Sequence, residues 1–307
     1  MPQMFWSYLR TVRGSDSHPA TSLGRILRQF VARPVAIGAL AVFGFVVLFS
    51  LAGPFLSPYS ADQIDWAVVG DVATKGQPSF ETGHYFGVDS LGRDMFARTV
   101  QSVRTSLAVG LLAVLVSSIL GMVWGAVAGY VGGLADQLMM RAIDVLNSIP
   151  AVLLVSLLLL VFGRSLEVLF ISMGVLNCFG LARVVRARTR VIRALAFVEA
   201  AVAGGARAFD IVTRHILPNL LGLVVVHATM MVPELIFLES LISLMGVGVR
   251  DPEISLGSLI AEGAAGMLSG TLWQLLVPLG ALLLLQGNFY VIAETLRDTV
   301  DTARQET

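Results

Sequence analysis

Long apolar runs, separated by shorter polar stretches, make up most of the chain. An α-helix needs about 20 predominantly apolar residues to cross the roughly 30 Å hydrocarbon core of a bilayer. Six runs approach or exceed this length, and the fourth is the shortest. The predicted spans are 34–56, 105–130, 142–163, 166–182, 218–244 and 267–293. The pattern predicts an all-α polytopic membrane protein with six transmembrane helices.

The polar stretches between the spans differ in charge, and this difference predicts their orientation. Residues 1–33 hold five arginines and one acid, and residues 183–217 hold seven arginines and two acids. Residues 57–101 reverse the balance, with six acids and three basic residues. Because arginine-rich loops stay in the cytoplasm, both termini and 183–217 are expected on that side.

This orientation predicts an insert between the first two spans that lies outside the membrane. A shorter insert, 246–266, is expected on the same side and is in part re-entrant. The expected parts of the chain are a cytoplasmic segment 1–33, a first span 34–56, an extracytoplasmic insert 57–104, a transmembrane core 105–296 that contains the loop 183–217, and a cytoplasmic tail 297–307.

Composition narrows the chemistry that the chain can perform. Only 14% of the residues are charged, against about a quarter in a typical soluble protein, and the zero net charge gives no basic field for nucleic acid. One cysteine and four scattered histidines form no metal-binding pattern. The one lysine, Lys75, lacks the glycine spacing of a phosphate-binding P-loop. We therefore expect no metal site, bound cofactor or catalytic residue, and any ATP energy must come from another subunit.

The segment "FVEAAVAGGARAFDIVTRHILPN", residues 197–219, is unusually polar for its place between two spans. Glu199 begins a stretch of good helix formers. It lies at the N-terminus of the predicted helix, where the helix dipole favours a carboxylate. Gly204 and Gly205 predict a stop and a sharp turn, and Pro218 suits the first turn of the next span. Helical spacing resumes between them with Phe209, Val212 and Ile216. A helix this short needs a groove on a partner. Periodicity alone leaves open an arginine-rich loop that only fixes topology.

The residue order of this segment resembles a cytoplasmic loop of ABC importer membrane subunits. That loop reads Glu-Ala-Ala, three residues, Gly, nine residues, Ile, any residue, Leu-Pro. The matching positions are Glu199, Ala200, Ala201, Gly205, Leu217 and Pro218. His215 replaces the isoleucine, and "RHILPN" is similar to the dipeptide, oligopeptide and nickel branch of the family.

Similarity to that branch extends over most of the chain. Residues 84–113 resemble the segment that leads into its second span, 129–150 the connection into its third, and 238–249 the end of its fifth. The N-terminal span resembles the extra first span of the second permease of a pair. Near the C-terminus the usual Gly-Asp and Pro-Arg around "LRDTVD" are missing.

The resemblance implies a type I ABC importer fold in which 199–218 contains a coupling helix that docks into an ATPase. The implied coupling residues are Glu199, Ala200, Ala201 and Gly205 as its core, Arg207, Phe209 and Asp210 as its contact surface, and Leu217 and Pro218 as its link to the fifth span. The implied partners are a homologous second permease in a heterodimer, two ATPase subunits that hold ATP and Mg, and an extracytoplasmic solute-binding protein. The chain itself is then a non-catalytic subunit in the bacterial cytoplasmic membrane. It moves short peptides or a related small solute by alternating access.

Ionisable residues within or near the spans are candidates for the transport pathway or for packing, because burying them in a bilayer is costly. Arg141 and Asp144 lie three residues apart on a predicted helix, so a structural pair is favoured over a pathway role. Glu239 matches a family position, whereas Glu234 matches none that we can assign. His227 is expected to pack rather than to bind a metal.

Small residues and prolines predict local features of the spans. Glycines four residues apart in the second span permit close contact with another helix of the same chain. These are Gly121, Gly125 and Gly129. Prolines within the spans predict kinks, because they remove a helical hydrogen bond. They are Pro150, Pro233 and Pro278.

Two other classes of protein stand as alternatives. An ion-driven secondary transporter predicts inverted repeats with discontinuous helices, and no internal repeat is visible. An intramembrane enzyme or a non-transporting assembly factor is less consistent with the chain, which shows no nucleophile–base arrangement. In the importer, the insert 57–104 is expected to receive the solute-binding protein or to cover the mouth of the pore.

Overall fold

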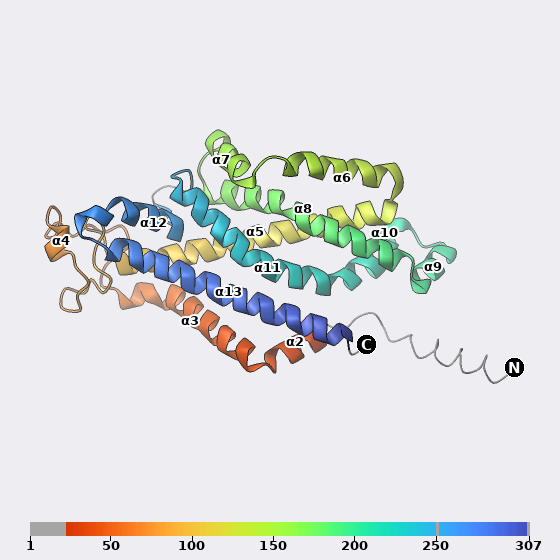
Figure 1. The fold of residues 1–307 in the computed structure, drawn as a ribbon, viewed down its shortest axis with the longest axis horizontal. Coiled ribbons are helices and arrows are strands. Elements are labelled where there is room, and N and C mark those ends of the chain that lie inside the picture. Colours follow the sequence, from red (N-terminus) through yellow and green to blue (C-terminus); the bar gives the residue numbers. More distant parts are fainter. Residues whose placement is uncertain (1–22, 250–251, 306–307) are drawn as a thin grey trace.

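A computed structural model describes residues 23–249 and 252–305, and Figure 1 shows them as an elongated bundle of helices. Within these residues there are two isolated β-bridges and no strand. The helices are α2 Leu23–Val31, α3 Pro34–Leu56, α4 Val72–Lys75, α5 Met95–Val131, α6 Gly133–Asn147, α7 Ala151–Phe162, α8 Leu166–Arg193, α9 Ala196–Ala203, α10 Ala208–Ile211, the π-helix η1 Val212–Ile216, α11 Leu217–Leu244, α12 Leu256–Ala265, the 3₁₀-helix η2 Met267–Ser269 and α13 Trp273–Gln305.

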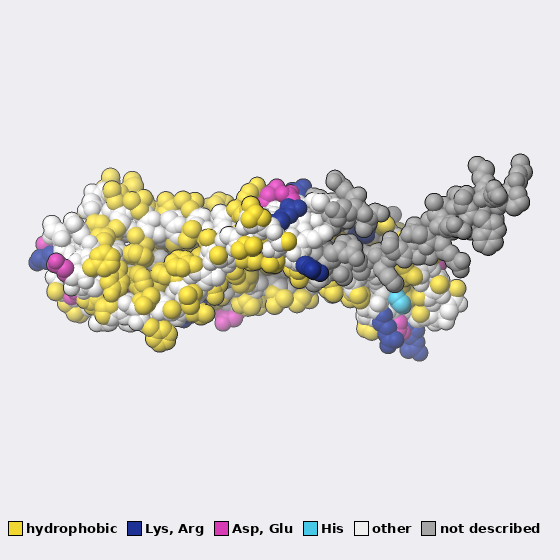
Figure 2. Space-filling model, turned by 90° about the horizontal axis from the view of Figure 1, so that it is seen from below, with side chains coloured by type: hydrophobic (Ala, Val, Ile, Leu, Met, Phe, Trp, Pro, Cys, Tyr) yellow, Lys and Arg dark blue, Asp and Glu magenta, His cyan; other side chains and the backbone are white. Residues whose placement is uncertain are grey.

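The lengths and apolar character of these helices confirm a polytopic membrane protein. Among the described residues, α3, α5, α8, α13 and the run Ala208–Leu244 are each long and apolar enough to cross a bilayer. α6 and α7 together form a sixth candidate span, bent by 82° at their junction. The face in Figure 2 is covered by hydrophobic side chains over much of its middle, as a lipid-facing surface requires.

The second span begins earlier than predicted, so the insert before it is shorter than 57–104. α5 starts at Met95, and the Asp94 carboxylate caps it by accepting the backbone N–H of Ala97 at 2.8 Å. Arg98 lies in this first part of α5. Its charge lowers the hydrophobicity of the stretch, so the sequence pattern placed the stretch outside the span, although ion pairs bury the Arg98 side chain. The insert therefore comprises residues 57–94.

The third span is a broken helix rather than the continuous run 142–163. α6 ends at Asn147, and Pro150 caps the N-terminus of α7 in a non-helical conformation with ψ 127°. Because proline has no N–H and restricts the residue before it, the chain cannot continue α6 through this point. The kink predicted at Pro150 is in fact a full break.

The fourth span begins at Leu166 as predicted but continues past residue 182 to Arg193. Arginine is a good helix former, and basic side chains are favoured near a helix C-terminus, so the charged residues extend α8 instead of ending it. The loop predicted at 183–217 consequently starts only at Ala194.

The last span is displaced toward the C-terminus relative to 267–293. α13 begins at Trp273 because Gly270, with φ 77°, turns the chain between η2 and the helix, and it continues to Gln305. The insert predicted at 246–266 contains the apolar helix α12, whose Leu256 and Leu259 are buried. Residues 250–251 of that insert, and 1–22 and 306–307 of the predicted cytoplasmic ends, lie outside the described residues.

α5 and α8 form the closest helix pair of the core. A Cβ added at Gly121 would lie 2.8 Å from the Cys178 carbonyl oxygen, and one at Gly129 would lie 2.6 Å from that of Arg186. No larger side chain fits between these backbones without moving α8. The prediction that the glycines of the second span pack within the chain is confirmed.

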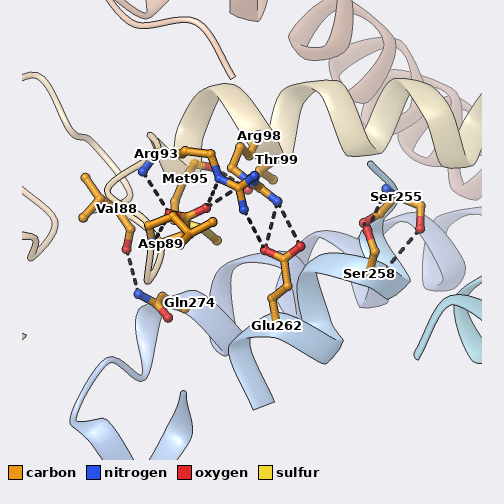
Figure 3. A network of polar contacts seen from close by, with 11 residues as sticks. Val88, Asp89, Arg93, Met95, Arg98, Thr99, Ser255, Ser258, Glu262 and Gln274 are labelled. Atoms are coloured by element: carbon orange, nitrogen blue, oxygen red, sulfur yellow. Dashed lines mark hydrogen bonds and ion pairs between the residues drawn. The ribbon is translucent and has the colours of Figure 1, made fainter. Parts of the chain in front are cut away.

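The insert is fastened to the helices beside it by buried polar contacts (Figure 3). Trp273 and Gln274, at the start of α13, donate side-chain hydrogen bonds of 3.0 and 2.9 Å to the carbonyl of Val88. Arg98 of α5 contacts Asp89 at 3.1 Å and Glu262 of α12 at 2.9 Å. The insert thus folds onto the ends of three helices.

Candidate functional site

The segment between α8 and α11, residues 194–217, forms a helix, a turn and a second helix, and we call it the elbow. α9 carries Glu199 in its first turn and ends at Ala203. Gly205 has φ 77°, a conformation that favours glycine, and the Ala206 N–H donates to the Ala201 carbonyl at 3.1 Å to close the turn. The order of helix, glycine turn and helix agrees with the sequence.

Apolar side chains on one side of the elbow hold it against the bundle. Val198, Ile211 and Ile216 are almost fully buried in a cluster with Leu181 and Val185 of α8. Burying a side chain of this size stabilises the packed state by about 1.5–3 kcal/mol. The elbow is therefore a fixed part of the fold, not a mobile loop.

The opposite side of the elbow is exposed and combines apolar and charged residues. Phe209 is 76% exposed and Val202 54%. Glu199 and Arg207 are exposed beside them. Figure 1 places α9 at the end of the bundle opposite α4, beyond the ends of its neighbours. An exposed aromatic residue within a polar surrounding is typical of a protein–protein contact.

The remaining predicted coupling residues lie along the same elbow. Ala200 is exposed and Ala201 half-buried on α9, while Asp210 is half-buried and lies 3.6 Å from Arg214. Helical spacing groups Phe209 with Ile216, but the structure separates them: Ile216 is fully buried and Phe209 points outward. The apolar residue that packs at this turn is Ile211.

The second half of the elbow continues into the fifth span without a loop. The Leu217 N–H donates to the Val212 carbonyl, five residues earlier, which makes one turn of π-helix before Pro218. A proline in a helix clashes with the carbonyl four residues before it, so a wider turn at this point accommodates Pro218. The Asn219 side chain bonds the His215 carbonyl at 2.6 Å. Sequence reasoning placed Pro218 in the first turn of the span but did not foresee this continuous helix.

Arginines of α8 support the elbow from behind, a role that the sequence did not reveal. Arg186 and Arg190 both bind Asp136 of α6, which is 1% exposed. Arg193 donates to the Tyr130 carbonyl at 2.6 Å and lies over the Tyr130 ring. These contacts tie the ends of α5, α6 and α8 together, and the elbow starts from this junction.

The candidate pathway residues are distributed differently from the prediction. Asp144 pairs with Arg183 of α8 at 3.0 Å, so the predicted structural pair between Arg141 and Asp144 is wrong. Helix α6 turns the Asp144 carboxylate toward α8 instead of along its own surface. Glu239 is fully buried and accepts hydrogen bonds from Ser106 at 3.1 Å and Ser243 at 2.8 Å, which makes it a packing residue between α5 and α11.

Among the described residues, no group of three or more His, Cys, Asp or Glu side chains is placed to hold a metal ion. The arrangement that stands out is instead a rigidly supported, outward-facing elbow joined directly to a span. Such an arrangement can transmit a displacement caused by a docked partner into the membrane-spanning helix.

Comparison with known proteins gives two family matches. The model for "Binding-protein-dependent transport system inner membrane component" matches residues 121–292. The model for "N-terminal TM domain of oligopeptide transport permease C" matches residues 21–71. The first match contains the elbow, and the second contains α3.

Several curated proteins are similar over most of their length. The oligopeptide transport system permease protein OppC of Escherichia coli is 39% identical over 89% of both chains. OppC of Haemophilus influenzae is 38% identical over 89% of this chain and 86% of its own. The dipeptide transport system permease protein DppC of Bacillus subtilis is 36% identical over 89% of this chain and 83% of its own.

Proposed function

The chain belongs to the family of binding-protein-dependent transport system inner membrane components, and we propose that its solute is a short peptide. Family membership makes it an ABC importer permease rather than the ion-driven secondary transporter considered above. The named relatives transport oligopeptides or dipeptides, which supports the same class of solute here. A related small solute is the alternative within the family.

The elbow is the proposed coupling site, and the observation that carries this is its exposed Phe209 and Glu199 on a rigid support. ATP-driven closure of the ATPases would displace α9. Because Ala208–Leu244 is one helical run, the displacement passes into the fifth span and changes access to the pore. Ala200, Ala201 and Gly205 allow the ATPase to approach the backbone closely.

The proposed partners follow from this role. They are a homologous second permease, two ATPase subunits that bind ATP and Mg, and an extracytoplasmic solute-binding protein. With the arginine-rich stretch 183–217 facing the cytoplasm, both termini lie on that side and the 57–94 insert faces the solute-binding protein. In this scheme the chain binds no cofactor and performs no covalent chemistry.

Co-purification with ATPase measurement tests the proposal. The chain is co-expressed with its genomic neighbours, and ATP hydrolysis stimulated by peptide-loaded binding protein is measured in lipid. Glu199→Lys reverses a charge on the docking surface, and Gly205→Asp places a side chain where φ is positive. We expect each change to lower stimulated hydrolysis by about tenfold or more, as for the loss of a central interface contact.

The matched control is Glu167→Lys, an exposed carboxylate in the first turn of α8, at the opposite end of that helix from the elbow, which leaves hydrolysis unchanged. Co-purification of the ATPases with normal stimulation in both elbow variants would contradict the coupling role. A complex that hydrolyses ATP in response to a solute other than peptides would retain the importer and replace the solute.

A further inference from the structure

A row of two ionisable and two apolar side chains follows one face of α11 at membrane depth. His227, Met230, Glu234 and Phe237 are spaced three, four and three residues apart, which places them on one side of a helix. Glu234 and Phe237 are exposed, and His227 and Met230 are half-buried. Glu234 stands ten residues from the end of α11 at Leu244, about 15 Å along the helix axis.

α13 presents a matching row beside it. Gln286, Tyr290 and Glu294 are spaced four residues apart, and Tyr290 is 65% exposed. The ring of Phe289 contacts Phe43 near the middle of α3, with centroids 5.2 Å apart. Glu294 follows Phe289 by five residues, about 7.5 Å, so it also lies within the span.

The two rows line a half-open cavity of about 310 Å³ between α11 and α13. Its lining includes Glu234, Glu294, Gln286, Tyr290 and Phe237. The Nε2 atom of Gln286 is buried and has no hydrogen-bond partner within the described part of the chain. The cavity thus combines two carboxylates, two aromatic rings and an amide group.

Lipid cannot cover this face at low cost. A charged side chain at the centre of a bilayer costs about 2.5–3.5 kcal/mol on insertion scales, and here two lie close together. The helices with the lipid-type surface are different: α3 and α7 contain no ionisable residue and expose side chains such as Phe45 and Leu160. The contrast indicates that lipid does not cover the α11–α13 face.

The sign of the charge identifies the ligand chemistry. The residues that line the cavity include no basic side chain; the nearest basic residues along the two helices are His227, seven positions before Glu234, and Arg297, three positions after Glu294. Carboxylates together with the face of a tyrosine ring attract ammonium and guanidinium groups. We propose that the α11–α13 face lines the translocation path and binds the cationic groups of the solute, such as a peptide amino terminus or a lysine side chain. The choice of solute rests on the proposed function, whereas the exposure of this face to the path does not.

The first arm of the test measures access. Cysteines are placed at Glu234 and Glu294 in a Cys178→Ala background of the assembled transporter, with Leu48→Cys on α3 as the lipid-facing control (63% exposed). Reaction with a membrane-impermeant cationic thiosulfonate is followed without ATP and in the ATP-trapped state. We expect Glu234→Cys and Glu294→Cys to react about tenfold or more faster than the control in at least one state, because thiols form reactive thiolate in water and not in lipid.

The second arm measures charge selection. Glu234→Gln with Glu294→Gln preserves shape and removes both charges, and Glu167→Gln on α8 is the matched control. Uptake of Ala-Lys-Ala and Ala-Gln-Ala is compared in proteoliposomes with saturating binding protein. We expect the double variant to lower Ala-Lys-Ala uptake about tenfold more than Ala-Gln-Ala uptake, while binding-protein-stimulated ATP hydrolysis persists.

Each failure has a separate meaning. Cysteines that react as slowly as the control show a face covered by lipid or by the second permease, and the inference is then wrong. Equal loss of both peptides removes the cation preference. A wild-type transporter that takes up neither peptide, although its cysteines react, overturns the peptide proposal and leaves the path assignment standing.

Discussion

The insert (residues 57–94) and the elbow are both polar interruptions of a hydrophobic chain, yet they use their polar residues in opposite ways. In the insert, His84 is buried between Asp94 at 2.9 Å and Asp65 at 3.3 Å, and its ring stacks on Tyr59. In the elbow, apolar residues face the bundle and charged and aromatic residues face outward. The polar groups of the insert are paired within the chain, whereas those of the elbow are exposed on its surface.

This difference shows what polarity along a sequence does not reveal. In the network shown in Figure 3, Arg98 pairs with both Asp89 and Glu262 of the same chain. Substitutions there therefore act on the stability of the chain. Side chains of the elbow such as Phe209 have few neighbours in the chain, so substitutions there act on association with a partner.

Arg98→Ala has the largest expected effect and acts on the fold. It removes a side chain that is 1% exposed and leaves the Asp89 carboxylate, 4% exposed, without this cation. Breaking a buried ion pair from one side costs about 3–5 kcal/mol. We expect a large fall in the thermal stability of the purified chain, measured by size-exclusion chromatography after heating. Arg207→Ala on the exposed elbow is the matched control, and equal losses in the two variants would contradict the division.

Phe209→Ala has an intermediate effect and acts on the partner. An aromatic residue at the centre of an interface contributes about 2 kcal/mol or more, so ATPase affinity is expected to fall by about thirtyfold. Thermal stability of the chain is expected to change little, because this side chain is 76% exposed. Phe80→Ala, 87% exposed on the insert, leaves ATPase binding unchanged. A loss of stability without loss of ATPase binding would place Phe209 in the fold instead.

Gly205→Ala has the smallest expected effect and tests the shape of the elbow. Its φ of 77° costs a residue with a Cβ about 1–2 kcal/mol, although no atom lies within 4 Å of the added group. Gly204→Ala is the matched control, because Gly204 has φ −76°. We expect a several-fold weaker ATPase association for the first variant only. Equal behaviour of the two variants would show that the turn itself does not matter for docking.

Hydrophobic periodicity was sufficient for the class of the fold and for many helix ends. Apolar runs located α3 and the end of the fifth span at Leu244, and the glycines of α5 indicated its packing on α8. The predicted ends of the spans were wrong where charged residues lie inside helices, as at Arg98 in α5 and Arg186 in α8. Hydrophobicity along the sequence assigns these residues to loops, because it contains no information on the acidic partners that neutralise them.

The order of residues was sufficient to locate the candidate site in the sequence. It was not sufficient to predict which side chains of the site point outward. Glu199, Gly205 and Pro218 mark a helix, a turn and the entry to a span, since each has a local backbone preference. Which of Phe209, Ile211 and Ile216 points outward depends on α8 and α5 behind the elbow. The same holds for Asp144, whose partner is Arg183 on another helix.

The sequence by itself determined the class of the fold, the polar segments between the apolar runs and the family to which the chain belongs, because these depend on local composition and residue order. Only the tertiary structure decided which polar groups are satisfied within the chain and which remain exposed. That division depends on distances between residues far apart in sequence, such as the 2.9 Å contact of Arg98 with Glu262. For the same reason, Glu234 and Glu294 form one acidic face only because α11 packs beside α13.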